Sequence, residues 1–317
     1  MIDPLGVIFG AGVALRNTLY DRQILKSHKL ARPVVSIGNL SVGGSGKTPF
    51  VIALGTLLKE RGVAFDVLSR GYGRNSTMVA IVDPSGTPEQ FGDEPLLIAR
   101  KLGVPVVVGA DRYQAGLLAE EKLPSKLHLL DDGFQHRRLH RDFDIVMLPD
   151  SDLSGTLLPF GRLREPKRGL FRADAVVMAS DRRPPNQAKL VWRIRRQIHF
   201  VDSRAKTVAF CGIARPRQFF SGLKQLGMEL VATVAFSDHH RYGQRDIERL
   251  LRIKSQTGAR EFITTEKDAI NLGPLLGELR TLRTATLDLE LQSPEKALEN
   301  LLGTLEERCQ CRFQGTA

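Results

Sequence analysis

The chain has 317 residues, 42% of them apolar and 26% charged, which is typical of a soluble globular protein long enough for two domains. Its 46 Lys and Arg outnumber 35 Asp and Glu, and the net charge of +11 predicts a polyanionic partner: a nucleotide, a nucleic acid or an anionic membrane surface. The three cysteines, Cys211, Cys309 and Cys311, show no framework spacing and no second pair for a metal site, so free thiols in a reducing compartment are expected.

An uncharged run near the N-terminus, residues 5–15 (LGVIFGAGVAL), precedes a basic flank. The bases of that flank are Arg16, Arg22, Lys26, Lys29 and Arg32. The run is too short to span a bilayer, which takes about 20 apolar residues, and an acid without a base before it makes a poor signal peptide. Two interpretations remain open: a helix packed on the next domain, which this segment alone favours, and an interfacial helix with its flank on anionic headgroups.

Segments rich in Val, Ile and Leu alternate with helical segments over most of the first 180 residues. The predicted strands are 32–40, 63–73, 104–110, 126–133, 143–149 and 173–179, and the predicted helices are 48–62, 93–103 and 111–123. This alternation is typical of a parallel sheet that helices cover on both faces. The chain is therefore expected to belong to the α/β class.

A second, smaller α/β unit is predicted after residue 204. Residues 206–236 are expected to form a strand, a loop, a helix and a strand, and residues 243–272 a helix, a strand and a polar turn. Before them, Pro184, Pro185 and a charge run interrupt the pattern, as a linker does. The predicted division is an N-terminal helix region at 1–32, a first domain at 33–185, a linker at 186–204 and a second domain at 205–317.

The segment 37–50, IGNLSVGGSGKTPF, resembles a phosphate-binding loop with one departure. Gly46, Lys47 and Thr48 match the end of the pattern, but the first standard glycine is replaced by Ser41. The segment follows an apolar strand and precedes a helix, so its glycines can turn backbone N–H groups towards an anion at the positive end of the helix. The predicted nucleotide-binding residues are Ser41, Val42, Gly43, Gly44, Ser45, Gly46, Lys47 and Thr48.

A Mg²⁺ site is predicted beside this loop. Lys47 would reach the β- and γ-phosphates, and the Thr48 hydroxyl would bind the metal. Such loops also need a carboxylate at the end of a nearby strand, and Asp131 and Asp132 follow the apolar residues 127–130 directly. Paired acids in a loop are usually only solvated, but in this context metal binding is the favoured interpretation. If the strand persists, the two side chains point to opposite sides and should have different roles.

A candidate base combines residues from both predicted domains. Asp93 and Glu94 open a predicted helix, where acids commonly offset the helix dipole, but a carboxylate there could also accept a proton from an attacking hydroxyl. Asp238, His239 and His240 lie on a loop of the second unit and are weak evidence by themselves. A carboxylate–imidazole pair drawn from two domains would nevertheless make a base that assembles on closure.

Residues 157–169, LLPFGRLREPKRG, concentrate four bases around Glu165. These bases are Arg162, Arg164, Lys167 and Arg168. One interpretation is a solvated basic face. The other is an anion clamp for the transferred phosphate or for a phosphorylated substrate.

Together these motifs resemble the tetraacyldisaccharide 4′-kinase (lipid A 4′-kinase) family of Gram-negative bacteria. The matching stretches are GNLSVGGSGKTP, LSRGYG, GDEPLLIA, GADRYQA, LLDDGFQHRRLHRD, LREP, FCGIARPRQFF, FSDHHRY and TTEKDA, in order from Gly38 to Asp268. DDGFQHR and TTEKDA together are far more specific than a phosphate loop. The family's loop also lacks the first standard glycine, so Ser41 agrees with it. The departures are Phe160 and Arg162, where a small residue and a proline are expected.

The resemblance implies ATP- and Mg²⁺-dependent phosphorylation of the 4′-hydroxyl of a tetraacyldisaccharide 1-phosphate, the lipid A precursor, to form lipid IVA. It implies two α/β/α sandwich domains, the first similar to P-loop NTPases, with the active site in the cleft between them. Lys47 and Thr48 would hold the phosphates and Mg²⁺, and Asp131 and Asp132 would serve the metal and the transferred group. The catalytic residues it implies are Lys47, Asp93, Arg112, Asp132, His136, Arg164, Glu165 and His239. Asp93 would pair with His239, which we favour over His240.

The resemblance also bears on location and partners. An enzyme with an acylated acceptor works at the bilayer, so residues 1–32 become a membrane-associating helix region on the cytoplasmic leaflet of the inner membrane. We expect a peripheral, monomeric protein without a nucleic-acid partner. The rivals are a nucleic-acid-dependent ATPase or GTPase switch and a non-catalytic nucleotide-binding membrane protein. Against the first, aromatic residues are only 6%, and TTEKDA has Glu266 where a guanine-reading motif needs Asn or Thr.

Overall fold

The computed structural model describes residues 4–179, 181–200, 205–311 and 313. Its strands are β1 (Val34–Asn39), β2 (Phe65–Ser69), β3 (Ala80–Ile81), β4 (Val106–Val108), β5 (Leu127–Asp131), β6 (Phe143–Met147), β7 (Ala175–Met178), β8 (Leu190–His199), β9 (Thr207–Cys211), β10 (Leu230–Ala235), β11 (Glu261–Thr265) and β12 (Leu282–Leu291). Its helices are α1 (Pro4–Asp21), α2 (Lys47–Glu60), α3 (Pro88–Phe91), α4 (Asp93–Leu102), α5 (Arg112–Lys122), α6 (Asp150–Leu153), α7 (Pro216–Gln225), α8 (Gln244–Thr257), α9 (Glu266–Leu272) and α10 (Pro294–Cys309), with 3₁₀ helices η1 (Lys167–Arg172) and η2 (Gly273–Glu278).

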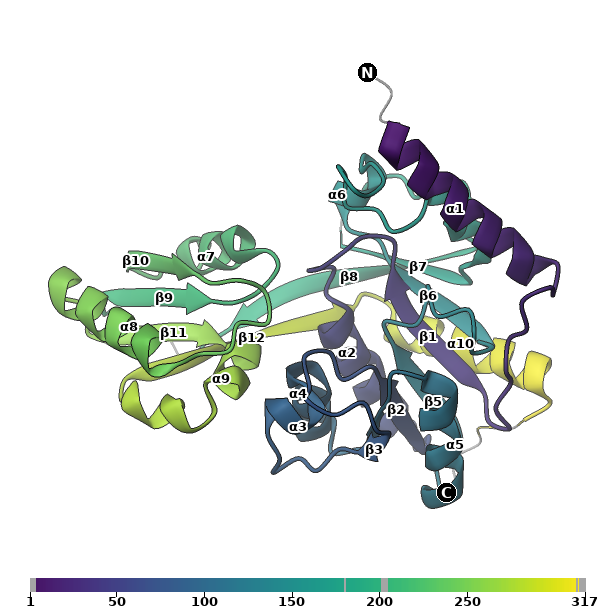
Figure 1. The fold of residues 1–317 in the computed structure, drawn as a ribbon, viewed down its shortest axis with the longest axis horizontal. Coiled ribbons are helices and arrows are strands. Elements are labelled where there is room, and N and C mark those ends of the chain that lie inside the picture. Colours follow the sequence, from purple (N-terminus) through teal and green to yellow (C-terminus); the bar gives the residue numbers. More distant parts are fainter. Residues whose placement is uncertain (1–3, 180, 201–204, 312, 314–317) are drawn as a thin grey trace.

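One sheet runs through both halves of the molecule. Among the described residues its twelve strands follow the order β10-β9-β11-β12-β8-β7-β6-β1-β5-β2-β4-β3. Figure 1 shows a larger lobe around β1 and a smaller lobe around β9, joined by the long strands β8 and β12. Pairing is parallel except at the β3 edge and between β8 and β12. The predicted α/β fold with a mainly parallel sheet is confirmed.

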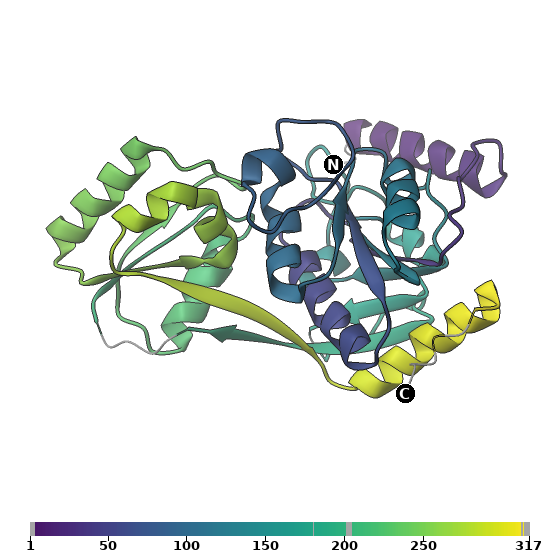
Figure 2. The ribbon, with the colours of Figure 1, turned by 90° about the horizontal axis from the view of Figure 1, so that it is seen from below.

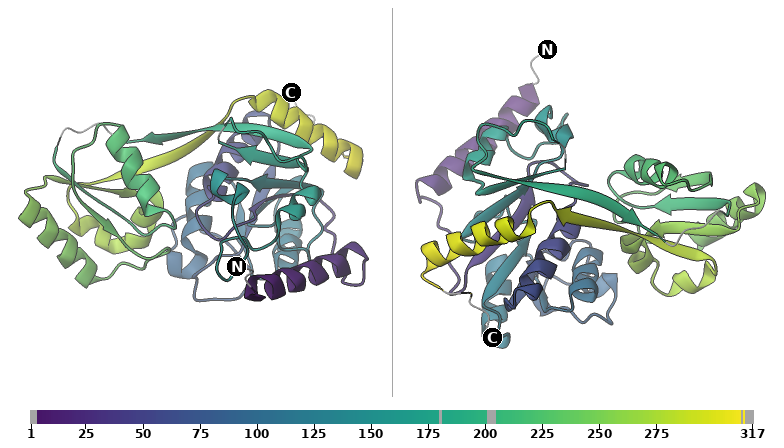
Figure 3. Two further views of the ribbon diagram at one scale, coloured as in Figure 1. Left: turned by 90° about the horizontal axis from the view of Figure 1, so that it is seen from above. Right: turned by 180° about the vertical axis from the view of Figure 1, so that it is seen from behind.

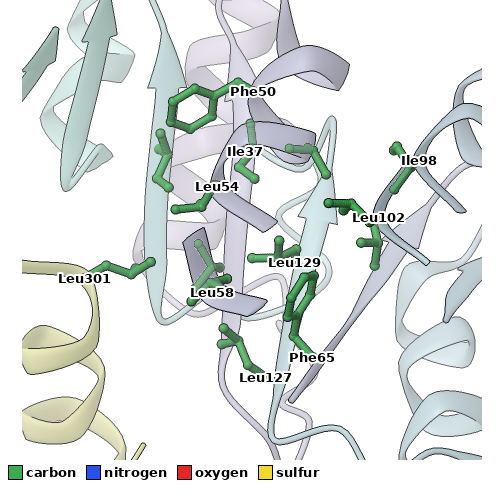
Figure 4. Close-up of a cluster of buried hydrophobic side chains, with 14 of the residues drawn as sticks. Ile37, Phe50, Leu54, Leu58, Phe65, Ile98, Leu102, Leu127, Leu129 and Leu301 are labelled. Atoms are coloured by element: carbon green, nitrogen blue, oxygen red, sulfur yellow. The ribbon is translucent and has the colours of Figure 1, made fainter. Parts of the chain in front are cut away.

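The core of the larger lobe explains why its strands are apolar throughout. β1 pairs in parallel with β5 and β6, and every residue in it is buried. Val35 and Ile37 belong to one cluster with Leu54 of α2, and Figure 4 shows Ile37 beside Leu54. Val34 joins a second cluster with Ala119 of α5 on the other face. A fully buried Leu or Ile contributes about 1.5–3 kcal/mol, so this three-layer packing fixes the strand ends that carry the site.

The segment predicted as a linker, 186–204, contains β8 instead. This strand pairs in parallel with β7 and then in antiparallel with β12, and Figure 3 shows the two long strands crossing side by side between the lobes. Trp192 and Ile194 are buried, while intervening residues are less covered, so one face of β8 is apolar enough to pack. Residues 201–204 of the predicted linker lie outside the described residues.

The chain returns to the larger lobe at its C-terminal end. Figure 2 shows α10 lying along the larger lobe, away from the smaller one. Ala297, Leu301 and Leu305 form an apolar stripe at helical spacing and are buried in the cluster that also contains α2. The predicted second domain, 205–317, therefore includes a helix that packs on the first.

The TTEKDA segment, expected as a polar turn, forms the start of α9. Thr265 caps this helix, with its side-chain oxygen accepting a hydrogen bond from the Asp268 backbone N–H. Asp268, Ile270 and Leu272 are buried. The cap and the buried face account for a helix where polarity alone predicted a turn.

The N-terminal helix α1 is bound to the larger lobe along one side. Arg16 donates to the Gln135 carbonyl at 2.7 Å, and Arg137 donates to the Asn17 carbonyl at 2.9 Å and to Asp21 at 2.7 Å. Other apolar side chains of the helix are exposed: Leu5, Val7, Ile8 and Leu15. Within the described residues, no helix is both long and apolar enough to cross a bilayer.

Candidate active site between the two lobes

A cleft of about 1270 Å³ lies where the two lobes meet. The phosphate-loop residues 43–48 and the carboxyl ends of β2 and β5 line it from the larger lobe. The loops that follow β9 and β10, and the start of α9, line it from the smaller lobe. Ligands of open α/β sheets bind outside the carboxyl ends of the strands, and the cleft occupies that position.

The glycines of the phosphate loop allow its backbone conformation and its close approach to the smaller lobe. Gly43, Gly44 and Gly46 have φ of +67°, +59° and +86°, which L-residues with a side chain rarely adopt. A Cβ at Gly43 would lie 2.9 Å from the Ala214 Cβ, and one at Gly44 would lie 2.8 Å from the Arg215 Cγ. The smaller lobe therefore packs directly over the loop.

Ser41 takes the position of the missing glycine without strain. Its backbone makes a β-bridge with Leu163, so it is extended and needs no left-handed φ. The Asn39 side-chain amide donates to the Ser41 carbonyl at 2.8 Å, and the Val42 N–H donates to the Arg162 carbonyl at 2.8 Å. The start of the loop is thus fixed by Asn39 before it and by Arg162 and Leu163, which lie far along the chain, and this pairing accounts for the replaced glycine.

Lys47 and Asp132 form a charged group at the head of α2. The Lys47 Nζ lies 3.2 Å from the Asn39 Oδ1 and 3.3 Å from the Asp132 Oδ1. Asp132 has a φ of +51° and also accepts from Arg164 at 3.1 Å. Burial opposes the charge on Asp132, but Lys47 and Arg164 outweigh it and hold the pKa of this carboxyl below its usual range.

Asp131 is a buried carboxylate with one oxygen that has no partner among the described residues. It ends β5, is buried, and accepts from the Ser69 hydroxyl at 3.3 Å, while its other oxygen, Oδ1, has no hydrogen-bond partner. Burial, together with the charges of Glu94 and Asp132, raises the pKa of Asp131 to about 7. No three His, Cys, Asp or Glu side chains of the described chain gather as a metal cage. Thr48 and the two aspartates still suit Mg²⁺, which usually takes one or two carboxylates, phosphates and waters.

Asp93 and His239 meet across the lobes. The His239 Nδ1 lies 2.9 Å and 3.1 Å from the two carboxylate oxygens of Asp93. Asp93 is 4% exposed and also accepts from the Glu94 N–H at 2.8 Å and the Asn271 side chain at 3.0 Å. Burial alone would raise its pKa, but the bond from His239, the charge of Lys267 and the Asn271 bond lower it to about 2. The two groups that the sequence paired are in contact.

Lys267 supplies the cation of this group. Its Nζ lies 3.1 Å from the Glu94 Oε1 and 3.1 Å from the His239 Nε2. The Asp238 and Asp93 carboxylates lie at 3.7 Å and 3.8 Å. Burial opposes the ammonium charge, but Glu94, Asp93 and Asp238 outweigh it and raise the pKa of Lys267. Lys267 is therefore a protonated donor.

The structure separates the two adjacent histidines. His239 has a φ of +57°, lines the cleft and packs against the Tyr72 ring at 4.9 Å between centroids. His240 turns the other way, where its Nε2 lies 2.9 Å from Asp246 and its ring stacks on Phe236 at 4.6 Å. His239 is thus the histidine in contact with Asp93, as favoured from the sequence.

Comparison with known proteins identifies the family. A family model described as tetraacyldisaccharide-1-P 4′-kinase, LpxK, matches residues 1–306. A tetraacyldisaccharide 4′-kinase from Koribacter versatilis is 49% identical over 97% of this chain and 99% of its own length. The chain belongs to the tetraacyldisaccharide-1-P 4′-kinase family. The enzyme of that name from Aquifex aeolicus is 40% identical over 85% of this chain and 88% of its own. A crystal structure of LpxK from Aquifex aeolicus in complex with ATP aligns with a TM-score of 0.78 at 34% identity, covering 95% of this chain and 97% of that one.

Three side chains that the LpxK resemblance placed at the site do not line the cleft. Arg112 is 6% exposed and donates to the Ala110 carbonyl at 2.7 Å. Burial and the charge of Arg70 lower the pKa of Arg112, although Asp131 and Asp132 lie close enough for their charges to oppose this shift. Burial and the charge of Arg112 lower the pKa of His136 to about 4, so this imidazole is neutral.

Glu165 is the third. It is 1% exposed and accepts from Arg172 at 2.7 Å and from Gln135 at 2.8 Å, with Asn17 of α1 at 3.5 Å. These bonds join α1, η1 and the segment after β5. Its neighbour Arg164 does line the cleft.

Sequence patterns in this LpxK-family chain missed several cleft residues. Arg70, Arg196 and Arg215 line the cleft, and the Arg196 guanidinium donates to the Ser45 carbonyl at 3.3 Å. Arg70 lies in the LSRGYG stretch, so only a motif marked it. Arg196 lies on β8, where the charge run indicated a linker. No local signal connects Arg196 to Ser45, which lies 151 residues away in the chain.

Proposed function

We propose that this chain transfers the γ-phosphate of ATP to the 4′-hydroxyl of a tetraacyldisaccharide 1-phosphate, forming lipid IVA. The observation that carries the proposal is that a phosphate loop and an Asp93–His239 pair, from different lobes, reach one cleft in a chain of the tetraacyldisaccharide-1-P 4′-kinase family. In the reaction the acceptor oxygen bonds to the γ-phosphorus, the bond to the β–γ bridging oxygen breaks, and ADP leaves.

The phosphate loop binds and orients the triphosphate. Its left-handed glycines allow backbone N–H groups to turn towards an anion at the start of α2, where the helix dipole favours negative charge. The Ser45 hydroxyl is buried without a partner and is available to a phosphate oxygen. Lys47 is held by Asn39 and Asp132 at the head of the helix, so its ammonium is positioned before ATP arrives.

The Mg²⁺ ligands are assigned to Thr48, Asp131 and Asp132. The unpartnered Oδ1 of Asp131 and the hard oxygen donors beside it support this assignment. Mg²⁺ held by these residues would offset the negative charge that develops on the phosphate oxygens. Asp132 also keeps Lys47 and Arg164 in place for the transferred group.

The Asp93–His239 pair is assigned as the base. His239 lines the cleft, whereas Asp93 is covered by its donors and, with a pKa of about 2, binds a proton weakly. Asp93 therefore orients the imidazole and stabilises its protonated form, and the His239 Nε2 accepts the hydroxyl proton. A sugar hydroxyl has a high pKa, so this transfer accompanies the formation of the phosphorus–oxygen bond.

The exposed apolar side of α1 supports attachment to the bilayer that holds the acceptor. Leu5, Ile8 and Leu15 recur at helical spacing and are 52%, 68% and 63% exposed. Basic residues follow them in the chain and can contact anionic headgroups. We place the protein peripherally on the cytoplasmic leaflet of the inner membrane. It acts as a monomer, because one chain supplies both halves of the site.

One experiment tests the assignment directly. The protein is incubated with γ-labelled ATP, Mg²⁺ and a tetraacyldisaccharide 1-phosphate, and the label is expected at the 4′ oxygen. An acceptor without a 4′-hydroxyl is the control and should remain unlabelled. Release of the label only as inorganic phosphate, or turnover that depends on RNA or DNA, would contradict the kinase assignment.

A further inference from the structure

Lys267 connects the two lobes beside the Asp93–His239 pair. Asp93 and Glu94, at the start of α4, belong to the larger lobe, while Asp238, His239 and Lys267 belong to the smaller one. Among the described residues, the Lys267 Nζ is the only cation within 4 Å of the Asp93 and Glu94 carboxylates, apart from the His239 ring itself. Its side chain is 15% exposed, so solvent screens these contacts only in part.

The hydrogen bond between Lys267 and His239 can have only one donor. A protonated lysine has donors and no acceptor, so at 3.1 Å the Lys267 Nζ donates and the His239 Nε2 accepts. The Nε2 atom then carries a lone pair, and the hydrogen of the neutral ring is on Nδ1, where it is donated to Asp93. This is the protonation state that a proton acceptor at Nε2 requires.

The acids around His239 work against that state. Asp93 at 2.9 Å, Asp238 at 4.0 Å and the charge of Glu94 all favour an imidazolium, which has no lone pair to offer. Lys267 is the positive charge that opposes them, because an Nε2–H would point at an ammonium. The remaining neighbour, Tyr72, contributes a ring contact.

We propose that Lys267 is a positioning residue that keeps the Nε2 of His239 unprotonated, and that the acceptor hydroxyl replaces the Lys267 ammonium at the Nε2 lone pair when the acceptor binds. The inference rests on the proposed function, because it concerns the base of that reaction. Lys267 acts through His239 and does not react itself. Loss of its charge should leave ATP binding intact and slow the transfer at pH values where the acids then protonate the imidazole.

The backbone around Lys267 is built to hold it in place. α9 packs on α4, and its start is fixed by the Thr265 cap. The next residue, Asp268, is fully buried and accepts from the Gly212 N–H at 2.7 Å and the Tyr242 hydroxyl at 2.8 Å. The lysine is therefore presented from a rigid element, as positioning requires.

The chain offers a matched control on the same two helices. Lys101 of α4 lies 2.6 Å from Glu266 of α9, so it also forms an ion pair between the lobes and lines the same cleft. Within the described chain, Lys101 makes no hydrogen bond or ion pair with His239. Lys101→Met removes one charge and one interlobe ion pair without touching the imidazole. Lys267→Met also removes one charge, together with the interlobe ion pairs to Asp93 and Glu94.

The test is a titration of His239 by ¹⁵N NMR with histidine-labelled protein, with the resonance assigned from its loss in His239→Gln. In Lys267→Met the pKa of His239 should rise by about one to three units, the shift that a nearby charge produces. The acid limb of the kcat profile should move to higher pH by the same amount. Lys267→Arg should restore both, and Lys101→Met should move neither. Lys267→Gln, which removes the charge and keeps a donor, repeats the test if the Met variant melts early.

The outcomes separate the two proposals. An unmoved His239 titration in both Lys267→Met and Lys267→Gln would overturn the role of Lys267. An unmoved acid limb with a large rise in the KM for ATP would place Lys267 on the nucleotide instead. Full turnover in His239→Gln would overturn the base assignment, yet the NMR titration would still report whether Lys267 controls the protonation of the ring.

Discussion

The phosphate loop and the base cluster face one cleft but are built in different ways. The loop is a single segment, residues 40–48, whose path is fixed by left-handed glycines and by hydrogen bonds within the larger lobe. The base cluster is assembled from α4, the loop after β10 and α9, and its bonds cross between the lobes. The path of the loop is therefore held mainly within the larger lobe, whereas the Asp93–His239 contact requires the two lobes to meet.

This difference assigns a distinct role to each half. A site whose phosphate end is permanent and whose base end depends on lobe contact can bind ATP first and complete its catalytic group afterwards. Variants on the two sides should therefore affect different steps.

The largest effect is expected at the loop. Lys47→Ala removes the ammonium that reaches the transferred phosphate, and kcat/KM should fall by about 10³-fold or more. It should be measured with labelled ATP and acceptor, and thermal melting should confirm that the variant is folded. Turnover close to that of the unmodified protein would show that the loop lysine does not contact the phosphate.

A smaller loss is expected at the base. Asp93→Ala should lower kcat by about 10²-fold, because general-base assistance contributes less than charge stabilisation when the proton moves late. His239→Gln should lose a similar factor, and the double variant should lose little more, because the two residues act as a unit. The KM for ATP should stay within about twofold if the base does not bind nucleotide. If the kcat loss of the double variant equalled the product of the two single losses, Asp93 and His239 would not act as a unit.

The pH profile carries a related expectation. Burial opposes the charge of His239, but Asp93 and the other acids raise its pKa above the usual value. Because the neutral ring is the active form, kcat should fall as the pH drops through this raised pKa. Asp93, with a pKa of about 2, should give no separate limb above about pH 4. A profile that is flat from pH 5 to 8 would remove His239 as the acceptor.

A third variant tests whether the base cluster depends on the buried hydrogen bonds that Asp268 makes within the smaller lobe. Asp268→Ala leaves the Gly212 N–H and the Tyr242 hydroxyl without their buried acceptor, which should cost about 2–4 kcal/mol in the free energy of unfolding. Urea unfolding measures this loss. Nucleotide binding by the folded protein should persist while transfer falls. Asp246→Ala, which removes a half-exposed acid of the same lobe, is the control and should cost about 1 kcal/mol or less.

The same contrast decides how much the sequence could predict. The loop, Lys47, Thr48 and the strand-end Asp131 were predictable because contiguous residues carry the glycine spacing and the apolar strand before it. The choice between His239 and His240 depends on a single backbone angle, φ +57° at His239, which no local pattern specifies. Asp93 and His239 were paired by resemblance, since 146 residues separate them.

Long-range pairing explains what was missed in the fold. β8 and β12 support each other in antiparallel register, and each is too polar to be recognised alone. The apolar stripe of α10 predicts that the helix packs on something. It does not predict that the helix packs in the cluster of α2 in the larger lobe and not on the smaller lobe, which precedes it in the chain. Lys267 lay in a predicted polar turn, so its place at the junction became clear only from α9.

The smallest effect is expected at α1, which belongs to neither half of the site. The double variant Ile8→Glu with Leu15→Glu puts two negative charges on the exposed apolar stripe of this helix. It should weaken binding to anionic liposomes by about tenfold or more. Leu226→Glu, at a site 52% exposed on the smaller lobe, is the matched control and should bind as before. Transfer to a detergent-dispersed acceptor should be unchanged, because the loop and the base do not contact this stripe. Unchanged liposome binding would mean that α1 serves only to pack on the larger lobe, through the contacts of Arg16 and Asn17.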